Sequence, residues 1–199
     1  MKKLLISILL LFTVTAYGQD NPLGVISDAV NRMPAFKSEF TISSPTPYGT
    51  VVSYSGRMTV KGGSYILMIP QMHIYSDGLN TWYYTPERDE VVIERAQGNE
   101  EAFGSPISLL TLSDKDFRVE TSGAGHLTAV PLEEELAASV EKVEMYYDVN
   151  TFLPRIVRLF SADGSHIDFR VDKIEPADIP DTSIFTFDTS KVKEVIDFR

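Results

Sequence analysis

Turn-forming residues recur along most of this chain at intervals of roughly 8–12 residues, which is the spacing typical of an all-β domain. Asp77-Gly78, Asn150-Thr151 and Asp163-Gly164 each separate runs that are rich in β-branched and aromatic residues. Asp-Gly between two such runs predicts a tight hairpin, because glycine adopts a positive φ without steric cost. The chain is therefore expected to fold mainly as an antiparallel sheet of short strands.

The turns divide the chain into strands of about five to ten residues. We expect strands at residues 36–43, 51–60, 65–69, 73–76, 81–85, 90–94, 117–121, 126–130, 140–149, 155–161 and 166–175. Residues 132–138 are expected to form a loop with at most one helical turn. The extended pieces at residues 185–188 and 192–197 are expected to pack across the body of the sheet.

Two segments depart from the strand pattern. Asn21-Pro22 predicts the start of a helix that ends at Pro34. Four apolar residues spaced three or four apart form one face of this helix, namely Leu23, Ile26, Val30 and Met33. The apolar run at residues 106–112 predicts one or two further helical turns, which could act as a lid between strands.

The first 18 residues have the pattern of a secretory signal peptide. Lys2 and Lys3 precede an apolar run at residues 4–14, and small residues follow at Ala16 and Gly18. This run is shorter than the roughly 20 residues that span a bilayer. We therefore expect cleavage before Gln19, export across the inner membrane to the periplasm, and a single domain at residues 19–199.

Charge and cysteine content exclude several classes of partner and site. Of the 18 basic residues, Lys2 and Lys3 would leave with the signal peptide, so that 16 remain against 28 acidic residues. Such an acidic chain is a poor partner for nucleic acid or anionic membrane surfaces. The sequence contains no cysteine, which excludes a lipobox cysteine, disulfides and cysteine-bound metals.

No pattern of catalytic or metal-binding residues emerges from the sequence. The three histidines, His73, His126 and His166, fall on different predicted strands and lack metal-ligand spacing. Glu133-Glu134-Glu135 and the pair Asp114 and Asp116 lie in polar connections, where carboxylates are normally solvated. No Gly-x-Ser-x-Gly sequence or glycine-rich phosphate loop is present. We therefore predict no catalytic residue, no metal and no cofactor.

The order of several motifs resembles the LolA-like periplasmic carriers of outer-membrane lipoproteins. Ser76-Asp77-Gly78 is followed by Trp82, Tyr84 and Pro86 in the family's Trp-x-Tyr-x-Pro pattern. Weaker matches are Phe36 and Phe40 after the first helix, Pro106 before the lid, and Phe185-Thr186-Phe187 followed by Val195-Ile196-Asp197 near the end. The resemblance implies a mainly β fold with minor α content, an incomplete (unclosed) antiparallel β-barrel with helices covering its concave side.

The resemblance also implies a function without catalysis. A LolA-like carrier is a monomer that binds lipoprotein acyl chains in an apolar cavity, receives them from an inner-membrane lipoprotein-releasing transporter and passes them to an outer-membrane acceptor. By position, the residues that would line the cavity and lid are Ile26, Val30, Phe40, Ile66, Met68, Ile107 and Leu110. Each of them is equally well explained as an ordinary core residue.

One departure from the family pattern keeps other cargoes open. Where the family has Lys-Arg-Pro, this chain has Lys61-Gly62-Gly63, so the arginine that helps to hold the closed state is missing. A carrier or sensor of another lipid or glycolipid is therefore an alternative. A carbohydrate-binding module is a second alternative, in which the sugar would stack on Trp82, Tyr83, Tyr84, Tyr146 and Tyr147.

Overall fold

The computed structural model describes residues 21–46, 48–96, 105 and 107–199. The predicted signal peptide and Pro106, at the start of the predicted lid, lie outside the described residues. Within the described residues, no helix is long and apolar enough to cross a membrane.

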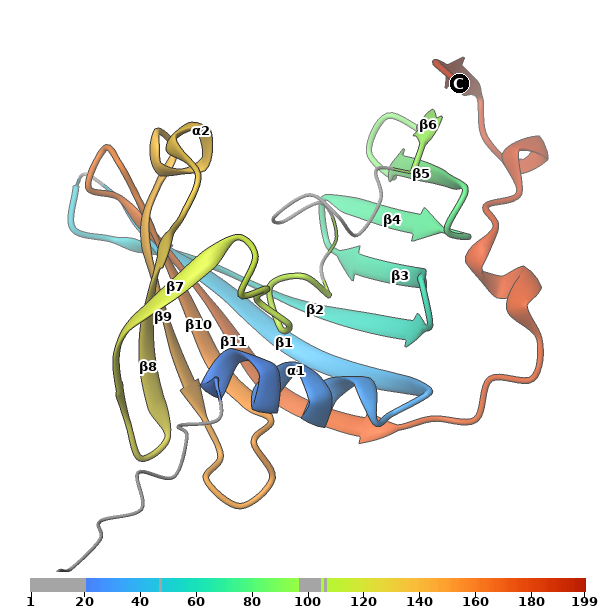
Figure 1. Ribbon diagram of the computed structural model, residues 1–199. Helices are drawn as coiled ribbons and strands as arrows, with labels where there is room; N and C mark the ends of the chain where they lie inside the picture. The colour runs from blue at the N-terminus through green and yellow to red at the C-terminus, as the bar shows by residue number, and fades with distance from the viewer. Residues whose placement is uncertain (1–20, 47, 97–104, 106) are drawn as a thin grey trace, which may run out of the picture.

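Twelve strands form one strongly curved sheet (Figure 1). They are β1 (Ala35–Pro45), β2 (Val51–Lys61), β3 (Ser64–Ile69), β4 (Met72–Ser76), β5 (Asn80–Thr85), β6 (Glu90–Arg95), β7 (Phe117–Gly123), β8 (His126–Pro131), β9 (Val140–Tyr147), β10 (Pro154–Ser161), β11 (His166–Pro176) and β12 (Glu194–Asp197). All eleven expected strands are present, with ends that shift by at most two residues.

The sheet is unclosed. Its strand order is β12-β6-β5-β4-β3-β2-β1-β11-β10-β9-β8-β7, so β7 and β12 are its two edges. Neighbouring strands are antiparallel except β12, which runs parallel to β6. The predicted incomplete antiparallel barrel is therefore confirmed, with one parallel pair added at an edge.

Helix α1 (Pro22–Asn31) lies across the concave side of the sheet, which we call the inner face (Figure 1). The Asn21 side chain accepts a hydrogen bond from the backbone N–H of Leu23 at 3.2 Å and caps the helix, and Pro22 occupies its first turn. The predicted apolar stripe is buried on the sheet through Leu23, Ile26 and Val30.

The one or two helical turns expected after Pro106 are present as a single turn and not as a longer helix. Residues 107–110 form a hydrogen-bonded turn, in which the Ile107 carbonyl accepts from the N–H of Leu110 at 2.8 Å and of Thr111 at 3.1 Å. The Thr111 hydroxyl donates to the same carbonyl, and the Ser108 hydroxyl donates to the Ser105 carbonyl. Such hydroxyl groups offer the backbone alternatives to a continuing helix. Among the described residues, α1 is thus the only helix that covers the concave side.

A second helix of four residues, α2 (Glu134–Ala137), connects β8 to β9. Its length agrees with the single helical turn expected at residues 132–138. It stands at the end of a hairpin rather than over the sheet (Figure 1).

A two-residue turn sets which side chains of β2 and β3 face inward. Gly62-Gly63 joins the strands, so that Val60 lies opposite Tyr65 and Met58 opposite Leu67. These four side chains are buried in the core beneath α1. Side chains alternate along a strand, so Thr59 and Ile66 face the opposite side, which we call the outer face.

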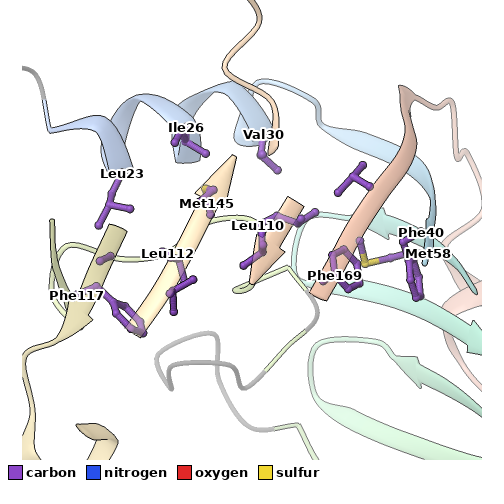
Figure 2. Close-up of a cluster of buried hydrophobic side chains, with 14 of the residues drawn as sticks. Leu23, Ile26, Val30, Phe40, Met58, Leu110, Leu112, Phe117, Met145 and Phe169 are labelled. Carbon is purple, nitrogen blue, oxygen red and sulfur yellow. The ribbon is translucent and has the colours of Figure 1, made fainter. Parts of the chain in front are cut away.

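The core is closed at its centre by an aromatic pair. Phe40 of β1 and Phe169 of β11 stack with ring centroids 4.7 Å apart (Figure 2). The Phe40 ring extends over Gly56, its cross-strand partner on β2. A larger residue at position 56 would leave no room for this ring.

The C-terminal arm, residues 177–199, covers the outer face of β3–β6, as expected of the extended pieces near the end of the chain. Phe185 is fully buried with Ala35 and Ile66. Phe187 packs on Tyr75 and Tyr84, with ring centroids 5.2 and 5.0 Å away. The arm ends in β12, which pairs with β6 at the edge of the sheet.

We predict that Gly56→Ala lowers the free energy of unfolding by about 1–3 kcal/mol. An added Cβ would lie 2.6 Å from Cε2 of Phe40 and 2.8 Å from the backbone oxygen of Met68, which cannot rotate away. Denaturant unfolding measures the change. Gly24→Ala is the matched control, because its Cβ meets nothing within 4 Å and lies within α1. It should raise stability by about 0.5–1 kcal/mol.

We predict that Phe185→Ala lowers the free energy of unfolding by about 3–5 kcal/mol, because the side chain is fully buried and its loss leaves a cavity. Phe198→Ala, at a residue that is 70% exposed on the same arm, should change stability by less than about 0.5 kcal/mol. Thermal unfolding of both variants tests this, and equal losses would show that the arm is not anchored through Phe185.

Candidate functional site

The apolar inner face continues beyond the closed core into side chains that reach solvent. We call this partly exposed surface the inner wall. On β1, β2, β10 and β11 it consists of Ile42, Val52, Tyr54, Leu159 and Ile167. On β3–β6 it consists of Ile69, Met72, Ile74, Tyr83 and Val92.

Strand register places these residues on the inner face. Ile42 follows Phe40 by two positions and pairs with Tyr54, while Val52 pairs with Ser44. Leu159 pairs with Ile167 on one side and with the core residue Val143 on the other. The exposed fractions of Val52, Tyr54 and Ile167 are 41%, 37% and 42%. The wall therefore extends the core without a break but is left partly open.

The inner wall carries no charged side chain where β1 meets β2. From Thr41 to Gly56 the sequence contains no acidic or basic residue. On the opposite half of the wall, burial raises the pKa of Tyr83, to which the nearby charge of Glu94 also contributes. Burial likewise raises the pKa of Tyr65. Both phenols are neutral at physiological pH, and Glu94 lies on the same face of β6 as the wall residue Val92.

The turn at residues 107–112 covers part of the inner face next to α1. Leu110 and Leu112 are buried and lie among the core side chains of α1 and the sheet (Figure 2). Ile107 and Leu109 are only partly buried against the same cluster. The turn is therefore anchored by two leucines and presents two further apolar side chains at its surface.

Five of the seven predicted cavity residues come together on the inner face. Ile26, Val30, Phe40 and Leu110 are fully buried in one cluster, and Ile107 packs at its margin. Ile107 is thus the one of these five with a partly exposed side chain.

The other two predicted cavity residues lie on the outer face. Ile66 packs against Ile179 and Phe185 of the C-terminal arm. Met68 lines an outer cavity of about 390 Å³ together with charged side chains such as Lys37 and Arg57. The expectation that Ile66 and Met68 face inward was wrong. The register set by Gly62-Gly63 directs Tyr65 and Leu67 inward, so the residues that alternate with them point outward.

Sequence reasoning missed most of the inner wall, although one signal could have found it. A two-residue turn pairs the residues that flank it, so Lys61 must pair with Ser64. Counting back from this pair along β2 gives the inward set Val60, Met58, Gly56, Tyr54 and Val52.

The departure from the family pattern at position 62 has a local explanation. Gly62 sits in the exposed turn between β2 and β3 with φ of 57°, a conformation that side chains other than glycine adopt at a cost. An arginine placed there would strain the turn. A Gly62→Arg substitution would therefore report on the hairpin as much as on cargo exchange.

The five aromatic residues considered for sugar stacking do not share a surface. Trp82 is only 5% exposed and packs with residues of β6 on the outer face, under the C-terminal arm, while Tyr83 faces inward. Tyr84 packs on Phe187. Tyr146 lies beside His126, and Tyr147 stacks on Phe152.

The three histidines are equally separate. His73 lies beside Tyr84, His126 beside Tyr146 and His166 beside Phe160. In the ranges that the structure describes, no group of three or more histidine, cysteine, aspartate or glutamate residues could hold a metal ion.

Comparison with solved structures bears on the fold. A protein from Thermus thermophilus, described as an uncharacterized conserved protein, matches with a TM-score of 0.59 and 10% sequence identity over 89% of this chain and 97% of its own. A LolA superfamily protein from Nitrosomonas europaea matches with a TM-score of 0.48 and 14% identity over 83% and 96% of the two chains.

A domain from Vibrio parahaemolyticus named for outer membrane lipoprotein sorting matches with a TM-score of 0.41 and 10% identity over 77% and 91% of the two chains. No protein-family profile and no curated protein sequence matches this chain. At these identities the likenesses speak to the fold alone. The match to the Thermus thermophilus protein supports the unclosed sheet described above.

Proposed function

We propose that this chain, which has a LolA-like fold, is a periplasmic carrier that shields lipoprotein acyl chains on its inner wall between the inner and outer membranes. The observation that carries the proposal is the inner wall itself. It joins the core at Phe40 and Leu67, is partly open to solvent, and lies next to a turn that presents Ile107.

The energetics of acyl burial fit such a wall. Removing one CH₂ group from water is worth about 0.8 kcal/mol, so a dozen would contribute roughly 10 kcal/mol before the costs of binding. Binding of that strength holds cargo in water. Release then requires a receiving site, or an opening of the wall, that offsets most of this gain.

The proposed partners follow from the resemblance and from the chemistry of the cargo. An inner-membrane lipoprotein-releasing transporter would load the wall, and an outer-membrane acceptor would empty it. A monomer is the simplest form for such a shuttle.

A carrier or sensor of another lipid or glycolipid would use the same inner wall and remains the second candidate. It is favoured by Gly62, which occupies the position where the family has arginine. A carbohydrate-binding module has less support, since Trp82 is buried and the other candidate aromatics are scattered over both faces.

The proposal predicts that the mature protein, purified from the periplasm of its own host, carries a lipoprotein with intact acyl chains in native mass spectrometry. A free lipid or glycolipid in its place would move the function to the second candidate. A protein that is empty and also fails to take up lipoprotein from inner-membrane vesicles would rule out the carrier function.

We predict that Ile107→Glu weakens binding of acyl ligands at least tenfold and leaves the fold intact, because the side chain is partly exposed at the margin of the wall. Displacement of a fluorescent fatty acid measures the affinity, and circular dichroism checks the fold. Leu79→Glu is the matched control, since Leu79 is 77% exposed in the turn between β4 and β5. A charge at the fully buried Leu110 would instead test folding.

A further inference from the structure

One half of β2 is a free strand edge. β2 pairs with β1 along its whole length, Val51–Lys61, but its pairing with β3 covers only Arg57–Lys61. In the part of the chain that the structure describes, residues 51–56 therefore have a strand on one side alone. A strand edge offers unpaired N–H and C=O groups to another extended chain.

The two hairpins that end β2 show which residues offer these groups. Lys61 and Ser64 flank a two-residue turn and so direct their backbone groups toward each other. Backbone direction alternates along a strand, which places the N–H and C=O of Ser53 and Ser55 on the same side as those of Lys61. At the other hairpin, Thr46 N–H donates to the Thr50 carbonyl at 2.7 Å, which agrees with this assignment.

This edge lacks the devices by which proteins usually protect free strands. Natural edges carry lysine, proline or a bulge that discourages pairing with another chain. Residues 51–56, Val-Val-Ser-Tyr-Ser-Gly, contain no charge and no proline. The pairing of β1 with β2 runs without a register shift. Valine and tyrosine also favour extended backbone.

A cleft lies where β2 and β3 part. It has a volume of about 550 Å³ and is lined by Ser55 and Gly56 on one side and by Ile69 and Pro70 on the other. Inner-face Phe40 and outer-face Asp172, Glu39 and His73 also line it. The cleft therefore lies beside the free edge. It runs from the inner face of the sheet to the outer face.

We propose that the free edge of β2 binds, by strand addition, the extended peptide that follows the acylated residue of the cargo. This inference rests on the proposed function. With acyl chains on the inner wall beside Val52 and Tyr54, the attached peptide has to leave the wall. The cleft gives it an exit along Ser53 and Ser55, whose backbone groups are free to pair. The peptide that fits is extended and free of proline at the pairing positions.

Two ligands test the proposal on the full mature chain. The first is a dipalmitoylglyceryl-cysteine that carries a peptide of about eight residues, which is long enough to pair along the edge. The peptide contains only serine, asparagine, glycine and threonine. The second is the same lipid on cysteine amide without a peptide. We expect the first to bind about tenfold more tightly, since a few backbone hydrogen bonds are worth about that factor.

Ser53→Pro should abolish this tenfold advantage and leave binding of the peptide-free ligand unchanged. Proline removes an N–H that points away from β1, so the β1–β2 pairing is kept. Ser53→Ala is the matched control, because it removes the hydroxyl but keeps the backbone N–H, and it should bind both ligands as the unaltered protein does.

Hydrogen exchange on the unaltered protein gives an independent readout. Exchange of the Ser53 and Ser55 amides should slow with the peptide-bearing ligand and not with the peptide-free one. Equal affinity for the two ligands, or unchanged exchange, would overturn the inference while leaving the carrier function intact. Failure of both ligands to bind would overturn the carrier function and the inference together. Sedimentation equilibrium tests a further outcome. If the unaltered protein is a dimer and Ser53→Pro is a monomer, the edge binds a second copy of the chain and the inference is overturned.

Discussion

The two-residue turn at Gly62-Gly63 fixes which side chains of the first six strands face the inside of the open barrel. It pairs Lys61 with Ser64, and this register passes from β3 through β4 and β5 to β6. A slip of one residue would exchange the two faces of every strand that follows. The inward side chains of β3–β6, including their half of the inner wall, and the cluster beneath the C-terminal arm depend on this one turn.

An unclosed sheet has two faces, and in this chain different elements cover each of them. On the inner face, α1 and the turn at residues 107–112 cover only the centre, which leaves the wall partly open. The outer face of β3–β6 is covered by the C-terminal arm through Phe185 and Phe187. The outer face of β10 and β11 carries an ion pair across the two strands. There Arg158 makes two hydrogen bonds to Asp168, at 2.6 and 2.7 Å, and holds the pKa of that carboxyl below its usual value.

Local signals in the sequence predicted the strands and α1, because turn residues and apolar periodicity act over a few positions. The unclosed sheet was expected from the family resemblance and not from these signals. They did not predict on which face of the sheet Ile66 and Met68 lie. Residues 65–69 are all apolar, so no alternation of polar and apolar residues marks the outer face. The apolar run at residues 107–112 did predict the helical turn, in which the hydroxyls of Ser108 and Thr111 also bond to backbone carbonyls. The wall residues depend on pairing between strands and had to be located through register.

The absence of charge between Thr41 and Gly56 requires more than the wall to explain it. Val52 and Tyr54 face inward, so an acyl-binding wall accounts for their apolar character. Ser53 and Ser55 face outward, where a lysine would touch neither the wall nor the core and would protect the edge against pairing with other chains. An acyl-binding wall alone therefore leaves these two serines unaccounted for. A strand that receives a peptide accounts for both, because an edge without charge and with free N–H groups leaves pairing with another chain unopposed.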